Sequence, residues 1–213
     1  MSSDVQGRAL GPRALQTRQR LLDATEALLQ TRSVRDVSVV EIARQVETSP
    51  ATFYQYFRDV QEAVLCLAER AADEMPELLA LIDGPWRGRK GLETARSLVD
   101  AFVRHWDAHH AVLRLRNLAA EEGDRRFQRV RRAALAPLLE HLARRIAEFQ
   151  EEGRVAPQIH PYAAAAALAS ILERLAAYHR ELEYYEMSRE ELVETCARIL
   201  VQTLTGRPPP SPG

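Results

Sequence analysis

The chain has little glycine, only two cysteines and no long apolar run. Nine glycines are few for 213 residues, and the abundance of Ala, Leu, Arg and Glu indicates an all-α protein. No apolar segment reaches the length of a bilayer crossing, and the N-terminus lacks an apolar signal segment. We therefore expect a cytoplasmic protein that has no membrane partner.

The sequence also lacks the common signatures of catalysis. It contains no nucleophile elbow, phosphate loop or paired-carboxylate pattern, so it predicts no enzyme and no cofactor. Cys66 and Cys196 lie far apart without CxxC spacing, which predicts reduced thiols that serve packing. His105 and His109 have a spacing compatible with metal binding, but no further Cys or carboxylate cluster accompanies them, so we expect no metal site.

The net charge of −1 is divided unevenly along the chain. Eight arginines and six carboxylates give residues 1–58 a charge of +2, and the remainder carries −3. This mild asymmetry permits nucleic-acid binding by the N-terminal part but does not by itself indicate it.

The N-terminal part begins with two predicted helices. Apolar residues at helical spacing predict the first helix over 13–31. Ser38, with Glu41 three residues later, predicts a capping box that starts a short second helix through Val46.

A third predicted helix carries the strongest functional signal. Thr48 or Ser49 caps it, and Pro50 stands at the first helical position, where its missing N–H costs nothing. The helix is rich in hydroxyls and aromatics and keeps Phe53 and Phe57, four residues apart, for packing inward. This layout is typical of a helix-turn-helix whose second helix enters the DNA major groove.

The rest of the chain predicts six further, mostly longer helices, about nine in all. Asp59 caps a helix over 60–82, which Pro76 bends or restarts, and a loop follows over 83–91. Further helices are expected over 92–106, 111–120, 124–152, 162–182 and 189–205, with Pro137 kinking the third of these.

Four stretches of residues together resemble the TetR family of bacterial transcriptional repressors. They are Arg18-x-x-Leu21-Leu22-x-Ala24, Ser38-Val39-x-x-Ile42-Ala43, Ser49-Pro50-Ala51-Thr52-Phe53-Tyr54-x-Tyr56-Phe57 and Ala63-Val64-Leu65. The match covers roughly residues 13–67 in both spacing and residue class. The resemblance implies a homodimer that binds a palindromic double-stranded DNA operator and leaves it when a small-molecule effector binds.

This resemblance predicts a division of the chain into four parts. Residues 1–12 form a disordered arm, and 13–58 form a three-helix helix-turn-helix DNA-binding domain. Residues 59–205 form a helical ligand-binding and dimerisation domain, and 206–213 form a disordered tail.

The family pattern also assigns residues to DNA. It places Ser38 and Val39 against the DNA backbone and gives the Tyr54 hydroxyl to a phosphate, with ordinary packing as the alternative for Tyr54 and also for Tyr56. Arg8, Arg13 and Arg18 are each either clamps on the DNA backbone or solvated charges, and Arg8 could instead reach a minor groove. The DNA-facing residues of the third helix are predicted to be Ser49, Pro50, Ala51, Thr52, Gln55 and Tyr56, of which Gln55 can read an adenine edge and Ala51 or Pro50 a thymine methyl.

Two positions depart from the family. Glu47 stands in the turn where the family often has Gly, so this turn must tolerate a residue with a side chain. Val60 stands where the family commonly has a phosphate-binding Lys. Either Arg58 takes over that contact, or DNA affinity and its salt dependence are lower than usual.

The last two helices have the small and apolar faces that a dimer interface needs. Ala163–Ala167, Ser170 and Ala176 allow close approach of another helix, and the final helix has an apolar stripe. Two such helices from each chain predict a four-helix bundle, with an internal core as the alternative. Candidate contacts to a small, largely apolar ligand, each of which is alternatively plain core, are Phe102, Trp106, Leu113, Asn117, Phe127, Leu138, Leu142, Leu172 and Tyr178.

Other functions stay open from the sequence. A regulator of the same fold could lack a small-molecule inducer and respond to a partner protein or act as an activator. A helical ligand carrier or enzyme, in which the first three helices are merely structural, is the third reading.

Overall fold

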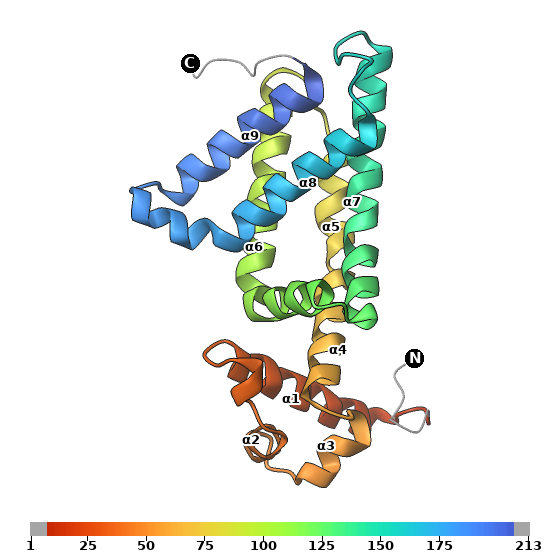
Figure 1. Cartoon of the computed structure of the whole chain (residues 1–213), viewed down its shortest axis with the longest axis vertical. Helices are drawn as coiled ribbons and strands as arrows, with labels where there is room; N and C mark the ends of the chain where they lie inside the picture. Colours follow the sequence, from red (N-terminus) through yellow and green to blue (C-terminus); the bar gives the residue numbers. More distant parts are fainter. Residues whose placement is uncertain (1–7, 207–213) are drawn as a thin grey trace. The chain divides into compact units, whose positions relative to one another are not determined.

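The computed structural model describes residues 8–206, which form the α-helices α1–α9 and three short 3₁₀ helices and contain no β-strand (Figure 1). The predicted all-α fold is therefore confirmed. Within the described part of the chain, we find no helix with the length and apolar character that a membrane span requires. The predicted arm falls largely outside these residues, and the predicted tail does so except for Gly206.

The chain packs into two compact units. Unit 1 is the chain up to Ala72 together with His109–Arg131. Unit 2 is Asp73–Ala108 together with the chain from Arg132 onwards. The predicted boundary between residues 58 and 59 separates a DNA-binding domain from a ligand-binding and dimerisation domain. The two units are defined by packing and not by function, so this boundary stays a prediction.

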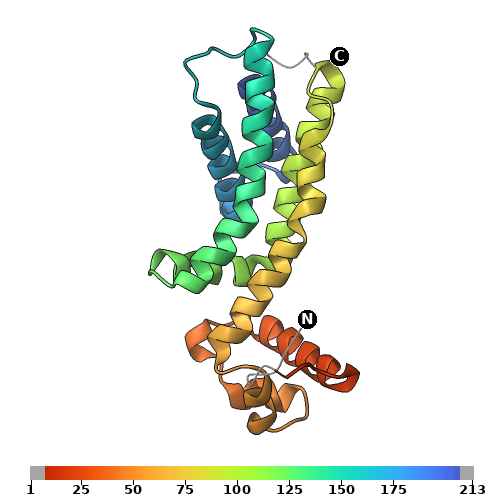
Figure 2. The ribbon, with the colours of Figure 1, turned by 90° about the vertical axis from the view of Figure 1, so that its right-hand side faces the viewer.

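Unit 1 begins with three helices that pack on one another (Figures 1 and 2). Helix α1 spans Pro12–Leu29, and the short 3₁₀ helix η1, Val34–Asp36, follows it. Helix α2 spans Val39–Gln45 and has the predicted capping box at Ser38 and Glu41. Helix α3 spans Pro50–Tyr56, and Ser49 is its N-cap.

Helix α4, Val60–Asp73, ends before the predicted helix does. The side chain of Asp59 accepts the N–H of Glu62 at 2.7 Å, so the predicted cap is present. The chain restarts as α5, Met75–Ala80, with Pro76 in the first helical positions, and η2 follows at Leu81–Asp83. Pro76 therefore restarts the helix, because its ring fits the first turn of a helix and not the interior.

The hydrophobic core of unit 1 includes residues that are distant in the sequence. Phe53, Phe57 and Leu21 are fully buried in it. Val112 of α6 and Phe127 of α7 belong to the same cluster. The segment 109–131 is therefore an integral part of the core that holds the helix-turn-helix.

Helices α6 and α7 each contribute residues to both units. Helix α6 spans Gly88–Glu121, where the sequence predicts two helices, and a kink with non-helical angles lies at His109. Helix α7 spans Arg125–Glu151 and contains Pro137. The predicted break between the two helices is therefore present, as the kink at His109.

Unit 2 ends with two helices joined by a 3₁₀ segment. Helix α8 spans Pro161–Tyr178, η3 spans His179–Tyr185, and α9 spans Arg189–Thr205. The predicted helix over 162–182 therefore ends four residues early, where the chain tightens into η3. A second capping box, formed by Ser188 and Glu191, starts α9.

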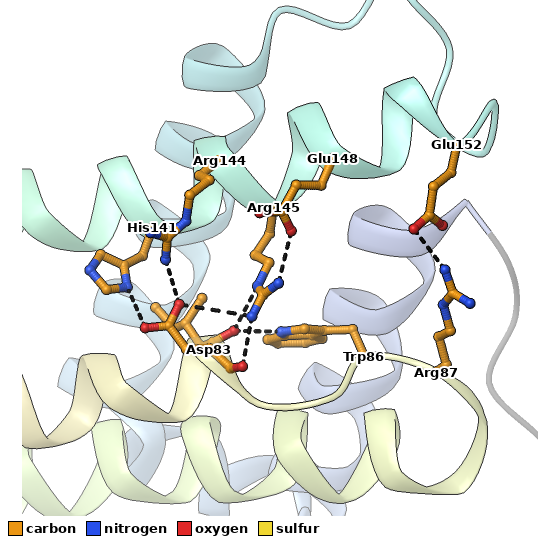
Figure 3. Close-up of polar contacts among 9 residues, drawn as sticks. Asp83, Trp86, Arg87, His141, Arg144, Arg145, Glu148 and Glu152 are labelled. Carbon is orange, nitrogen blue, oxygen red and sulfur yellow. Dashed lines mark hydrogen bonds and ion pairs between the residues drawn. The ribbon is translucent and has the colours of Figure 1, made fainter.

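The connection between α5 and α6 is fastened to α7 by a polar cluster (Figure 3). The Asp83 carboxylate faces Arg144 and lies 3.4 Å from Nδ1 of His141. Arg145 donates to the carbonyls of Ile82 and Asp83 at 3.2 and 2.6 Å. The buried indole N–H of Trp86 donates to the Ile82 carbonyl at 2.7 Å. This cluster fixes a short loop, and α6 begins at Gly88 within the predicted loop over 83–91.

Candidate nucleic-acid interface

Helix α3 separates an inward aromatic face from an outward polar face. Phe53 and Phe57 are fully buried, and their ring centroids lie 5.2 Å apart. Tyr54 is 53% exposed and meets Phe53 edge-on at 5.9 Å. The phenol ring of Tyr54 therefore packs on Phe53 while the side chain as a whole remains accessible to a partner.

The outward face consists of residues at helical spacing. Pro50, Ala51, Tyr54, Gln55 and Arg58 are all exposed. The first four recur at helical spacing and form one stripe along α3, and Arg58 is exposed just beyond the end of the helix.

Two predicted DNA contacts of α3 are less accessible than the sequence suggests. Thr52 and Tyr56 are half-buried. Tyr56 packs against the core of unit 1, and its ring lies 6.5 Å from that of Phe57. The structure thus places Thr52 and Tyr56 at the edges of the stripe, because the turn of the helix carries both toward the core.

The Ser49 and Thr52 hydroxyls at the start of α3 are hydrogen-bonded to each other. The Ser49 hydroxyl accepts the Thr52 N–H at 3.2 Å and lies 3.1 Å from the Thr52 hydroxyl. This capping arrangement orders the first turn of α3 and leaves these hydroxyls with less capacity for an external partner.

Helix α2 is held by an ion pair and its capping box. Ser38 donates its hydroxyl to the Glu41 carboxylate at 2.8 Å and accepts the Glu41 N–H at 3.3 Å. The guanidinium of Arg32 and the Ser38 groups lower the pKa of Glu41 to about 2. Val39, the other predicted contact on α2, is half-buried against the core.

The turn between α2 and α3 contains the non-glycine residue that the sequence singles out. Glu47 has a φ of +56°, in the left-handed region. The Thr48 N–H donates to the Ala43 carbonyl at 2.9 Å, and the Glu47 N–H donates to the Arg44 carbonyl at 3.1 Å. This is a Schellman motif, in which Gly is the usual residue at the left-handed position.

Arg20 holds this turn from α1, a role that the sequence does not reveal. Its guanidinium donates to the Val46 carbonyl at 2.9 Å. The contact joins residues 26 positions apart, so no local pattern could have predicted it.

Arg18 differs from both of its predicted roles. It is half-buried, its guanidinium lies 5.1 Å from the ring centroid of Phe57, and it donates to the Cys66 sulfur at 3.1 Å. Burial raises the pKa of the Cys66 thiol, which keeps it protonated. Arg18 thus serves the packing of unit 1, while Arg8, Arg13 and Arg58 are exposed.

His109 belongs to a charged network within unit 1. Its Nδ1 lies 3.4 Å from the Glu26 carboxylate, which also pairs with Arg70. The pKa of Glu26 is lowered, first by the hydrogen bond with His109. The network links α6 with α1 and α4.

The predicted ligand contacts fall in both units. In unit 2, Tyr178 is 38% exposed beneath the Arg174 guanidinium, 3.9 Å from the ring centroid. Leu113, Asn117 and Phe127 lie in unit 1, where Phe127 is part of the core. The remaining predicted contacts are buried in unit 2, namely Phe102, Trp106, Leu138, Leu142 and Leu172.

Unit 2 also contains a cavity of about 370 Å³ between α6 and α9. Ion pairs cross it, including Arg96 with Glu194 at 2.5 Å and Arg189 with Asp100 at 2.8 Å. Its lining residues are Arg96, Asp100, Arg189, Glu190, Val193 and Glu194. None of them is a predicted ligand contact, and this charged lining differs from the apolar site that the sequence predicts.

Two family models match the chain. The model for the tetracyclin repressor-like C-terminal domain matches residues 78–211, more than half of the chain, and that for bacterial regulatory proteins of the tetR family matches residues 21–62.

Solved structures share the fold at low sequence identity. The fatty acid degradation regulator FadR from Bacillus halodurans is 16% identical with a TM-score of 0.65, over 91% of this chain and 97% of FadR. A tetR-family transcriptional regulator from Streptomyces coelicolor is 20% identical with a TM-score of 0.64, over 92% and 84%. SmeT, the repressor of the Stenotrophomonas maltophilia multidrug efflux pump SmeDEF, is 16% identical with a TM-score of 0.60, over 89% and 88%.

Proposed function

This chain belongs to the TetR family of bacterial regulatory proteins, and from that premise we propose that it acts as a cytoplasmic, homodimeric repressor of transcription. It is a transcriptional regulator with a helix-turn-helix DNA-binding domain. The proposed repressor binds a palindromic DNA operator and leaves it when a small, largely apolar ligand binds.

The two-faced helix α3 carries this proposal. Its aromatic face is fully buried at Phe53 and Phe57, so the orientation of the helix is fixed. Its exposed stripe presents Tyr54 and Gln55, whose groups can bond to phosphates and base edges. Arg58 is exposed just beyond the helix and takes the phosphate contact that Val60 cannot make. The proposed contacts on the DNA are Ser38, Val39, Ser49, Pro50, Ala51, Thr52, Tyr54, Gln55, Tyr56 and Arg58.

Exposed faces on α8 and α9 support the dimer. Tyr162 is 55% exposed on α8 and Ile199 is 42% exposed on α9. Small exposed residues follow Tyr162 along α8, namely Ala163, Ala166, Ala167 and Ser170. They allow the close approach of two helices from a second copy of the chain, as in a four-helix bundle.

The proposed effector site is in unit 2. Its support is that predicted contacts such as Phe102 and Trp106 are buried apolar residues of this unit. SmeT has been solved as a complex with triclosan, so one protein of this fold binds a small molecule. We place the ligand contacts at Phe102, Trp106, Leu138, Leu142, Leu172 and Tyr178.

Replacing Tyr54 with Phe tests the DNA-binding part. We expect Tyr54→Phe to weaken binding to the DNA upstream of its own gene by roughly 5- to 15-fold, the equivalent of one hydrogen bond of about 1–1.5 kcal/mol. Fluorescence anisotropy measures the affinity, and circular dichroism confirms that the fold is kept. Tyr184→Phe is the matched control, because Tyr184 is 86% exposed in unit 2. Equal affinities of both variants would refute the phosphate contact of Tyr54.

The charged cavity favours a second candidate, a regulator of the same fold without an apolar inducer. Five of the six residues that line the 370 Å³ cavity carry charged groups. Native mass spectrometry of the purified protein with the DNA upstream of its own gene distinguishes these two candidate functions. A dimer with a bound small molecule supports the ligand-responsive repressor, and a DNA-bound dimer that never retains one supports the alternative.

A further inference from the structure

The recognition helix carries no charged side chain. The seven residues of α3, Pro50–Tyr56, include neither Arg nor Lys and neither Asp nor Glu. Guanine is read most often by Arg or Lys at its O6 and N7 atoms, and cytosine is read by a carboxylate that accepts from N4. Helix α3 therefore lacks the side chains that identify G·C pairs.

Gln55 is the residue of the stripe best suited to read a base. The hydroxyls of Ser49 and Thr52 already bond to each other at 3.1 Å. Tyr54 ends in a single hydroxyl, which cannot donate and accept in the side-by-side geometry of a base edge. The amide of Gln55 is exposed and has this geometry, which matches N6 and N7 of adenine.

Ala51 lies one helical turn before Gln55 on the same exposed stripe. Residues four apart on a helix are neighbours, with Cβ atoms about 5–6 Å apart. A small apolar side chain at this position can approach the major groove closely and contact a thymine methyl. Pro50, also exposed, adds a second apolar surface next to it.

We propose that α3 reads A·T base pairs, with Gln55 as the specificity-determining residue for an adenine and Ala51 in contact with a neighbouring thymine methyl. This inference rests on the proposed function, because it assumes that α3 enters the major groove. The operator half-sites should therefore contain A·T pairs at the positions that Gln55 and Ala51 contact.

Selection from a library of random DNA duplexes tests the proposal with the full-length protein. The wild type should enrich half-sites with an adenine at one fixed position. Gln55→Ala should lose the preference at that position alone, and the discrimination lost should be roughly 5- to 150-fold. Tyr54→Phe is the matched comparison, since it should weaken binding to all sequences alike and keep the preference.

The possible results separate the two proposals. Failure to bind any duplex would overturn the repressor function, and with it the assignment of α3. Binding with a G·C pair at the position that depends on Gln55 would overturn only the A·T assignment. An unchanged preference in Gln55→Ala, with helix content unchanged by circular dichroism, would do the same.

Discussion

Replacing Glu47 with Gly should stabilise the protein, because the turn holds this residue in a conformation that glycine adopts freely. Its φ is +56°, and the Schellman hydrogen bonds on either side fix it there. A non-glycine residue in the left-handed region costs about 1–2 kcal/mol. The Glu47 side chain is exposed, so its removal uncovers little of the core.

Part of this gain is lost in the unfolded chain. Glycine gives the unfolded state more conformational freedom, which costs about 0.4–1 kcal/mol of stability. The expected net effect of Glu47→Gly is therefore an increase of about 0.5–1 kcal/mol in the free energy of unfolding. For a chain of this size the melting temperature should rise by about 1–4 °C.

Urea and thermal unfolding followed by circular dichroism measure this change. Glu47→Gln is the matched control, because it removes the charge but keeps a side chain at the left-handed position. We expect the Gln variant to be close to the wild type and the Gly variant to be more stable than both. A Gly variant that is no more stable than the Gln variant would show that the turn holds Glu47 without strain, and the reasoning would be wrong.

Further predictions concern the capping box, a close backbone contact and the shared core. Ser38→Ala should lower the free energy of unfolding in urea by about 1 kcal/mol, because the hydroxyl bonds the Glu41 N–H. Since the Glu41 pKa is lowered to about 2, its carboxylate stabilises the fold above about pH 4.5, and this contribution is lost as the pH falls toward 2. Arg32→Gln should raise this pKa toward 4.5 in an NMR titration, and an unchanged value would contradict the role of Arg32. Gly91→Ala should destabilise by about 1–3 kcal/mol in thermal unfolding, because its Cβ would lie 2.4 Å from the backbone of the loop before α6. Phe127→Ala should cost about 3–5 kcal/mol and weaken DNA binding, whereas an altered ligand response with unchanged stability would instead mark a ligand contact.

The local signals in the sequence predicted the start of α2, α3 and α4 correctly. A capping box, a proline at the first helical position and an acidic cap each act within four residues, so their effect can be read without the fold. The Glu47 turn is a similar case. The resemblance to the family implied that this turn must tolerate a side chain where glycine is usual, and the structure has Glu47 there with a φ of +56°.

Long-range contacts account for what the sequence could not predict. Arg18 and Arg20 stand on one predicted helix, and the sequence offered Arg18 as a clamp for the DNA backbone or a solvated charge and gave Arg20 no role. Arg18 instead lies over Phe57 and Arg20 holds the Val46 carbonyl, since the folded chain brings these groups together. A helical pattern alone cannot distinguish an arginine that is exposed to solvent from an arginine that packs on an aromatic ring.

The same ambiguity explains Phe127, which the pattern offered as a ligand contact. A pocket wall and a protein core both require an apolar residue on the inner face of a helix, so periodicity cannot separate them. The choice depends on what the segment packs against. Here the segment His109–Arg131 runs from the kink in α6 into the first turns of α7, and its Val112 and Phe127 share a core with Phe53. The base-reading helix is therefore supported from within by residues more than 50 positions away, and its stability cannot be understood from the helix-turn-helix segment alone.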